Sequence, residues 1–166
     1  MTTTDPTTLR RQAGPIVKAL ASIGHELGRP FTMQTQPGRF RIQKTVYLLK
    51  HSGYRPAGKY SFNLYHMGPY SPDLAAAYYA FEDAELRDSP RTNDISPATL
   101  AVLRDALGHD DPFLEGLTTT LDVWRAGNDL RVALSQARSI KPHLGEDTWR
   151  EVRRFLTDHP GLITRT

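Results

Sequence analysis

The chain has 166 residues, of which 39% are hydrophobic and 23% charged, a composition typical of a globular protein with one hydrophobic core. It contains no cysteine, which excludes disulfides, thiolate metal sites and a cysteine nucleophile. The longest apolar run, Leu74 to Phe81, has eight residues, fewer than the roughly 20 that a membrane-spanning helix requires. The N-terminus lacks the pattern of a secretory signal. We therefore predict a single domain over residues 1–166, located in the cytoplasm, with no membrane contact.

Charge is unevenly distributed along the chain. Residues 1–72 carry a net charge of +8, residues 73–124 carry −8 and residues 125–166 carry +3. A basic first part of this kind could bind an anionic partner such as nucleic acid. Alternatively, the oppositely charged parts neutralise each other within the fold. The sequence does not decide between the two, because it does not show whether the basic residues share a face.

The first part of the chain is predicted to be helical. Residues 1–8 are rich in threonine and are expected to be disordered. Apolar residues then recur at helical spacing and predict helices over residues 15–27 and 39–51. Gly28 and Gly53 follow these helices and can cap them.

A small β element is expected next. Residues 60–66 alternate, with Tyr60, Phe62 and Leu64 on the side predicted to be buried. The short segment 32–35 is a candidate partner strand. A turn then leads to Ser71, an N-cap before a proline, and predicts a helix over residues 72–85.

The remainder of the chain is predicted to be a series of helices. Ser96 and Asp111 each precede a proline, as Ser71 does, and can cap a helix. The predicted helices cover residues 97–107, 112–126, 129–138 and 145–157, with Asn128 as the cap of the third. The fold class is therefore mainly α with a small β element (α+β).

The sequence contains little catalytic apparatus. It has no glycine-rich phosphate loop, and its six histidines show no pair at the spacing of metal ligands on one helical face, so neither a metal nor a cofactor is indicated. Arg104 and His109 resemble the arginine and histidine of the HEPN ribonuclease signature. Arg154 and His159 share that spacing, so the pattern is not specific. Gly108 and the acidic residues after His109 instead predict an exposed interhelical turn.

Basic residues in and after the second predicted helix are the better candidates for function. Arg41 and Lys44 are expected to lie opposite its apolar stripe, where they could contact a phosphate backbone. The alternative is a solvated helix face. The candidate nucleic-acid-binding residues are Arg39, Arg41, Lys44, Lys50, Arg55 and Lys59.

Two segments together resemble a known family. The first is Arg41-Ile-Gln-Lys-Thr-Val-Tyr-Leu-Leu-Lys50, and the second is Tyr65-His-Met-Gly-Pro-Tyr-Ser-Pro-Asp-Leu74. They resemble the corresponding helix and turn of the YwgA-like proteins and of the related Panacea (SocA-like) antitoxin domains. His66 and Met67 stand where that pattern has a tyrosine beside the Gly-Pro pair.

The resemblance implies a winged-helix-like core over residues 15–87 and a helical extension over residues 96–163, with no catalytic residues to carry over. Panacea domains are associated with toxin neutralisation through protein contact. The turn residues Gly68, Pro69, Tyr70, Ser71 and Pro72 are expected to be structural, since glycine permits an unusual backbone angle and proline fixes the next one.

These observations favour a non-enzymatic recognition module. Its partner would be DNA, as for a transcription regulator, or a protein such as a toxin, with the acidic middle part offering a surface to a basic partner. The alternative is a HEPN-like ribonuclease that uses Arg104 and His109. The sequence does not determine the oligomeric state, a homodimer included.

Overall fold

The computed structural model describes residues 5–165, which form eight α-helices, two short 3-10 helices and one two-stranded antiparallel sheet. The elements in chain order are α1 (Pro6–Leu27), α2 (Gln36–His51), η1 (Arg55–Ala57), β1 (Asn63–Tyr65), β2 (Gly68–Tyr70), α3 (Pro72–Tyr78), α4 (Asp83–Asp88), α5 (Pro97–Leu107), α6 (Asp111–Arg125), α7 (Leu130–Ile140), α8 (Glu146–Asp158) and η2 (Pro160–Ile163). The fold is mainly α with a small β element, as predicted. Within residues 5–165, no helix is long and apolar enough to cross a membrane.

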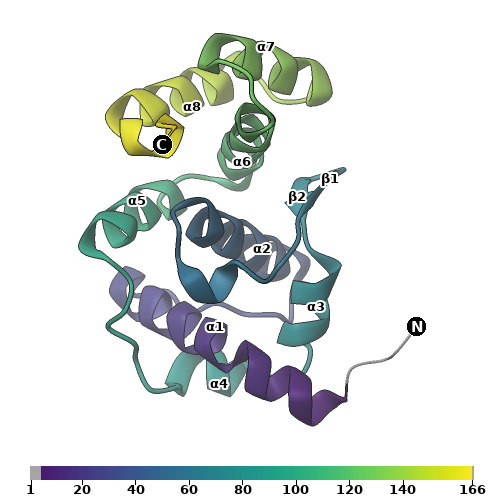
Figure 1. Cartoon of the computed structure of the whole chain (residues 1–166), viewed down its shortest axis with the longest axis vertical. Helices are drawn as coiled ribbons and strands as arrows, with labels where there is room; N and C mark the ends of the chain where they lie inside the picture. Colours follow the sequence, from purple (N-terminus) through teal and green to yellow (C-terminus); the bar gives the residue numbers. More distant parts are fainter. Residues whose placement is uncertain (1–4, 166) are drawn as a thin grey trace.

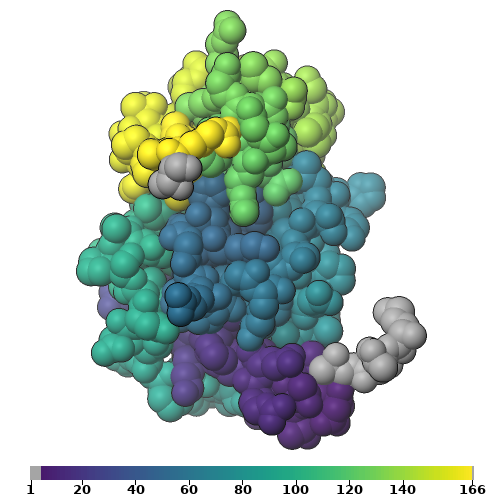
Figure 2. All heavy atoms as spheres, viewed as in Figure 1, coloured from purple at the N-terminus to yellow at the C-terminus, as the bar shows by residue number. Residues whose placement is uncertain are grey.

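Helix α2 occupies the centre of the molecule (Figure 1). It contacts α5, α6 and β2, while α1 packs against α3, α4 and α5. Helix α6 links α2 to α7 and α8, which form the other end of the molecule (Figures 1 and 2). Because α2 has neighbours on several sides, every residue from Ile42 to Leu49 is buried.

Helix α1 is longer than its sequence predicts. It begins at Pro6, so residues 6–8 are helical and the prediction of disorder is wrong there, while residues 1–4 lie outside the described residues. Pro15 lies inside the helix. The added turns are stabilised by contacts from distant positions: Arg10 donates to the carbonyl oxygen of Ala80 at 2.6 Å and pairs with Glu85 at 2.8 Å. Local spacing cannot reveal such contacts.

Helix α2 begins three residues before its predicted start. The side chain of Thr35 caps it, accepting a hydrogen bond from the backbone nitrogen of Gly38 at 3.0 Å. Gly28 and Gly53 follow their helices with φ of +64° and +87°, so both predicted glycine stops are confirmed.

The β element is a tight hairpin and is shorter than predicted. Strand β1 pairs with β2, and residues 32–35 form no strand, because Met33 donates its backbone N–H to Asp83 at 3.0 Å. Tyr60 is buried as predicted, whereas Leu64 is 37% exposed. The predicted buried face is therefore wrong at its outer end, since the hairpin projects from the helices (Figure 1).

The predicted serine caps are confirmed, and two others shift by one residue. Ser71 and Ser96 accept hydrogen bonds from backbone nitrogens three residues on, at 3.2 Å in each case. Asp110 caps α6 and Asp129 caps α7, in place of the predicted Asp111 and Asn128. Helix α3 ends at Tyr78, because a capping box that begins at Glu82 starts the separate helix α4.

Candidate binding cleft

The predicted basic face along α2 is not present. Lys44 is only 2% exposed, and Arg41 is half-buried, with its guanidinium paired to Asp111 at 3.1 Å and bonded to the carbonyl oxygen of Leu107. The prediction that both residues lie opposite an apolar stripe is therefore wrong. The prediction fails because α6 and the hairpin cover the side of α2 on which these charges lie.

The other candidate basic residues are mostly engaged within the fold. Arg39, Lys50 and Lys59 each donate to a backbone carbonyl, that of Met33 at 2.9 Å, of Tyr60 at 2.5 Å and of Gln12, respectively. Arg55 is exposed at the start of η1. The six residues thus do not form one exposed surface, and DNA binding by them stays a prediction.

Ion pairs connect the oppositely charged parts of the chain. Besides Arg10 with Glu85 and Arg41 with Asp111, Lys141 of the last part lies 3.9 Å from Glu115 of the middle part. Part of the basic charge is therefore paired within the molecule, as the second interpretation of the charge distribution expects: among the described residues, two of the ten basic residues of the first part, Arg10 and Arg41, pair with acidic residues of the middle part.

Arg104 and His109 bind different partners. Arg104 pairs with Glu26 at 3.0 Å, whereas the ring of His109 stacks on Phe113 with centroids 3.8 Å apart. His109 lies between α5 and α6, so its predicted position in an interhelical turn is confirmed, although its side chain is only 29% exposed.

The two segments that carry the family resemblance meet in space. The side-chain amide of Gln43 forms two hydrogen bonds of 2.9 Å with the backbone of Ser71, donating to its carbonyl oxygen and accepting from its N–H. One residue on, the ammonium of Lys44 donates to the carbonyl oxygen of Pro69 at 2.7 Å. These buried bonds hold the hairpin and the start of α3 against α2, and they explain why the two segments occur together.

Glycine is required at position 68, where the backbone of the hairpin passes close to Lys44 and Thr119. Its φ of +93° is strained for any side chain, and an added Cβ would lie 3.2 Å from Oγ1 of Thr119 and 3.3 Å from Nζ of Lys44. The structural role predicted for this glycine therefore follows from both its backbone angle and its surroundings.

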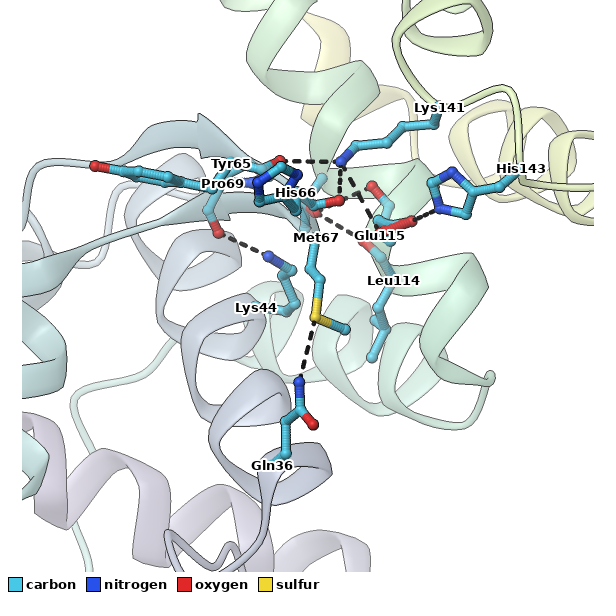
Figure 3. A network of polar contacts seen from close by, with 11 residues as sticks. Gln36, Lys44, Tyr65, His66, Met67, Pro69, Leu114, Glu115, Lys141 and His143 are labelled. Atoms are coloured by element: carbon cyan, nitrogen blue, oxygen red, sulfur yellow. Dashed lines mark hydrogen bonds and ion pairs between the residues drawn. The ribbon is translucent and has the colours of Figure 1, made fainter.

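A network of buried charges lies behind the hairpin (Figure 3). Lys141 donates to the carbonyl oxygens of Tyr65, at 3.0 Å, and of His66. Nε2 of His143 donates to one carboxylate oxygen of Glu115 at 2.8 Å, and the other carboxylate oxygen of Glu115 faces Lys141. Lys141 and Glu115 are 3% and 5% exposed. The network ties the α7–α8 connection and α6 to the hairpin.

Burial has the largest effect on the pKa of Lys44. It lowers the pKa of the Lys44 ammonium to about 7, an effect that nearby Glu115 opposes and nearby Lys141 reinforces. Burial also lowers the pKa of Lys141, again opposed by Glu115. Two buried ammonium groups thus share one buried carboxylate.

A cleft of about 410 Å³ opens between α2, the hairpin and α3. Several of its apolar side chains are unusually exposed: Tyr65 is 49%, Met67 43%, Tyr70 36% and Tyr79 63% exposed. The rings of Tyr65 and Tyr70 pack edge to face, with centroids 5.5 Å apart. The cleft is lined by Gln36, Arg39, Phe40, Gln43, Lys44, Tyr65, His66, Met67, Gly68, Tyr70, Pro72, Tyr78 and Tyr79. We call it the aromatic cleft.

Part of this site is predicted from the sequence. The prediction includes Arg39, Lys44 and the turn residues, but not Glu115, Lys141 and His143. The signal for Glu115 was a carboxylate within an otherwise apolar stretch of helix, and Lys141 and His143 flank Pro142 in a loop. Their approach to Lys44 depends on the packing of α6 and α7 against the hairpin, which no local pattern encodes.

Among residues 5–165, no group of three or more His, Asp or Glu side chains is arranged to hold a metal ion. In comparisons with known proteins, no family model matches the chain, and neither a curated protein nor a solved structure matches it. The aromatic cleft therefore has to be interpreted from its own chemistry.

Proposed function

We propose that this chain is a non-enzymatic recognition module that binds a partner protein, as the resemblance to the Panacea antitoxin domains implies, and that the aromatic cleft is the binding site. In this proposal, residues 15–87 form a winged-helix-like core that acts in the cytoplasm, with the β1–β2 hairpin as its wing. The observation that carries it is the exposure of Tyr65, Met67, Tyr70 and Tyr79 around one concave site.

Exposed tyrosines favour a protein partner. Tyrosine combines a large apolar ring with a hydroxyl and loses little conformational entropy on binding, so it is enriched at protein interfaces. An apolar surface gathered in a cleft marks a binding site more specifically than single exposed apolar residues do. The basic residues that would contact a phosphate backbone are instead largely bound within the fold, which makes duplex DNA the weaker candidate.

The proposal is tested by capture from the native host with the purified full-length chain. We expect a specific protein to be retained by the wild type and at least tenfold less by the Tyr65→Ser/Tyr79→Ser variant. Both side chains are largely exposed, so their replacement should leave stability within about 0.5 kcal/mol. Ile140→Ser is the matched control, because Ile140 is 46% exposed but does not line the cleft.

If the partner is a nucleic acid, the capture experiment should retain DNA in place of a protein. Retention of DNA, with an affinity that falls steeply with salt and weakens in Arg55→Ala, which changes an exposed candidate residue, would support the regulator hypothesis instead. Equal retention of the protein partner by the Tyr65→Ser/Tyr79→Ser variant would exclude the aromatic cleft as its binding site.

A further inference from the structure

The lining of the aromatic cleft contains basic side chains and no acidic one. Arg39 and Lys44 come from α2 and His66 from the hairpin turn, and none of the lining residues is an aspartate or a glutamate. The exposed tyrosines stand around this cationic floor. The cleft therefore combines an apolar rim with a positively charged floor.

The ammonium group of Lys44 retains hydrogen-bonding capacity. A protonated lysine has three N–H donors, and among residues 5–165 the carbonyl oxygen of Pro69 is the one acceptor bonded to it. The ring of Phe40 lies 5.0 Å from Nζ and adds only a weaker cation–π contact. A buried charge with unused donors is costly unless a further partner reaches it.

The buried charges behind the hairpin do not balance. Lys44 and Lys141 are each at least 97% buried. Within residues 5–165, Glu115 is the one carboxylate that acts on both, and it also hydrogen-bonds to His143. With both lysines protonated, the network carries an excess positive charge. That charge can be removed by loss of a proton from Lys44, or compensated by an anion in the cleft.

We propose that the floor of the aromatic cleft receives the carboxylate of an acidic side chain in the partner segment, which binds beside Lys44. An apolar residue next to the acidic one packs against the tyrosines. This inference rests on the proposed function, since it names the chemistry of the segment that occupies the cleft. A cleft of this volume has room for only a few residues of such a segment.

The pH dependence follows from the groups around Lys44. Glu115 of α6, Lys141 at the end of α7, His143 of the next loop, Arg39 of α2, Tyr78 of α3 and His66 of the hairpin turn surround it. Burial places the pKa of Lys44 at about 7 in the unbound protein, and a carboxylate beside it raises that pKa. Above pH 7 the affinity should therefore fall by up to tenfold per pH unit.

Three capped dipeptides test the proposal as probes in NMR titrations of the full-length protein. Acetyl-Phe-Glu-amide carries the side-chain carboxylate, acetyl-Phe-Gln-amide is its neutral isostere, and acetyl-Gln-Phe carries a terminal carboxylate instead. At pH 6.5 we expect acetyl-Phe-Glu-amide to bind at least tenfold more tightly than its isostere. The affected backbone amides should belong to α2, the hairpin and α3.

The titration of Lys44 supplies a readout in the unaltered protein. The chain has five lysines, so their side-chain carbon signals can be followed separately as the pH changes. Saturating acetyl-Phe-Glu-amide should raise the pKa of Lys44 by at least one unit and leave that of Lys50, which lies outside the cleft, unchanged. In Lys44→Gln, the preference for glutamate over glutamine should disappear.

Each outcome bears on the proposal. Equal binding of the glutamate and glutamine probes, or no perturbation of cleft amides by any probe, would overturn the carboxylate inference. Tighter binding of acetyl-Gln-Phe would overturn its assignment to a side chain and favour a chain terminus. None of these results affects partner capture by the wild type, whose loss in Tyr65→Ser/Tyr79→Ser is the separate test of the proposed function.

Discussion

Helices α2 and α6 enclose two polar clusters that are built alike and differ in charge. Lys44 and Glu115 belong to the first cluster, and His51 and Asp122, each seven residues further along the same helices, belong to the second. In the second cluster, Asp122 accepts a hydrogen bond from the hydroxyl of Tyr47 at 3.2 Å, and Nε2 of His51 lies 2.6 Å from the carbonyl oxygen of Leu162.

The two clusters differ in the charge that the basic side chain from α2 carries when it is buried. Burial lowers the pKa of His51, so this ring is neutral at pH 7 and its Nε2 donates to Leu162. The ring also lies near Trp124 and Tyr47. In the first cluster, an excess ammonium charge faces an open cleft. The comparison shows that one helix pair can hold a structural cluster, in which a neutral histidine and a tyrosine lie with one carboxylate, and a second cluster, in which two lysines share one carboxylate beside a cleft.

The largest expected effect is the loss of Glu115. Glu115→Gln removes the carboxylate shared by Lys44 and Lys141 and should destabilise the protein by about 3 kcal/mol at pH 6.5, because two buried ammonium groups are left without an anion. At pH 9 the loss should be smaller, since Lys44 is then deprotonated. Urea unfolding at both pH values measures it, with Glu151→Gln, which changes an exposed carboxylate, as the control. An equal loss at both pH values would contradict the shared-charge account.

Replacement of Lys44 should have a smaller effect with the opposite pH dependence. The folded-state pKa of Lys44, about 7, is below the ordinary lysine value, so the unfolded chain binds more protons and stability rises from pH 7 toward pH 10. Relative to Lys44→Met, the wild type should gain about 2 kcal/mol between pH 7 and pH 9. Lys50→Met is the comparison for a lysine outside the cleft. Parallel stability curves for wild type and Lys44→Met would show that Lys44 does not titrate in this range.

Local sequence signals predicted the elements well and the site only in part. Ser71, Ser96 and the glycines after α1 and α2 act within a few residues, so the starts and ends they mark were predictable. The charged site depends on long-range packing instead. Lys44 looked like a surface residue because lysine is seldom buried, and its environment is set by Glu115, 71 residues away along the chain.

The extension of α1 illustrates the same limit. Pro15 is a reasonable first-turn residue. The helix before it is favoured by contacts from distant residues, those of Arg10 with Glu85 and the Ala80 carbonyl and that of Lys59 with the Gln12 carbonyl. The exposed end of the hairpin is a further case. Alternation predicted a buried Leu64, but alternation does not show how far a strand extends beyond the helices that cover it.

The smallest effect we predict concerns the cluster of Tyr47, His51 and Asp122. Tyr47→Phe removes the hydroxyl that binds Asp122 and should destabilise the protein by about 1 kcal/mol, the usual worth of one buried hydrogen bond. Burial and Asp122 both raise the pKa of Tyr47, so the hydroxyl keeps its proton throughout the neutral range. The loss should therefore be the same at pH 7 and pH 9, unlike that of Lys44→Met, when both are measured by urea unfolding. A loss that changed by more than about 1 kcal/mol across this range would mean that the Tyr47 cluster gains or loses a proton there, and the contrast between the two clusters would no longer hold.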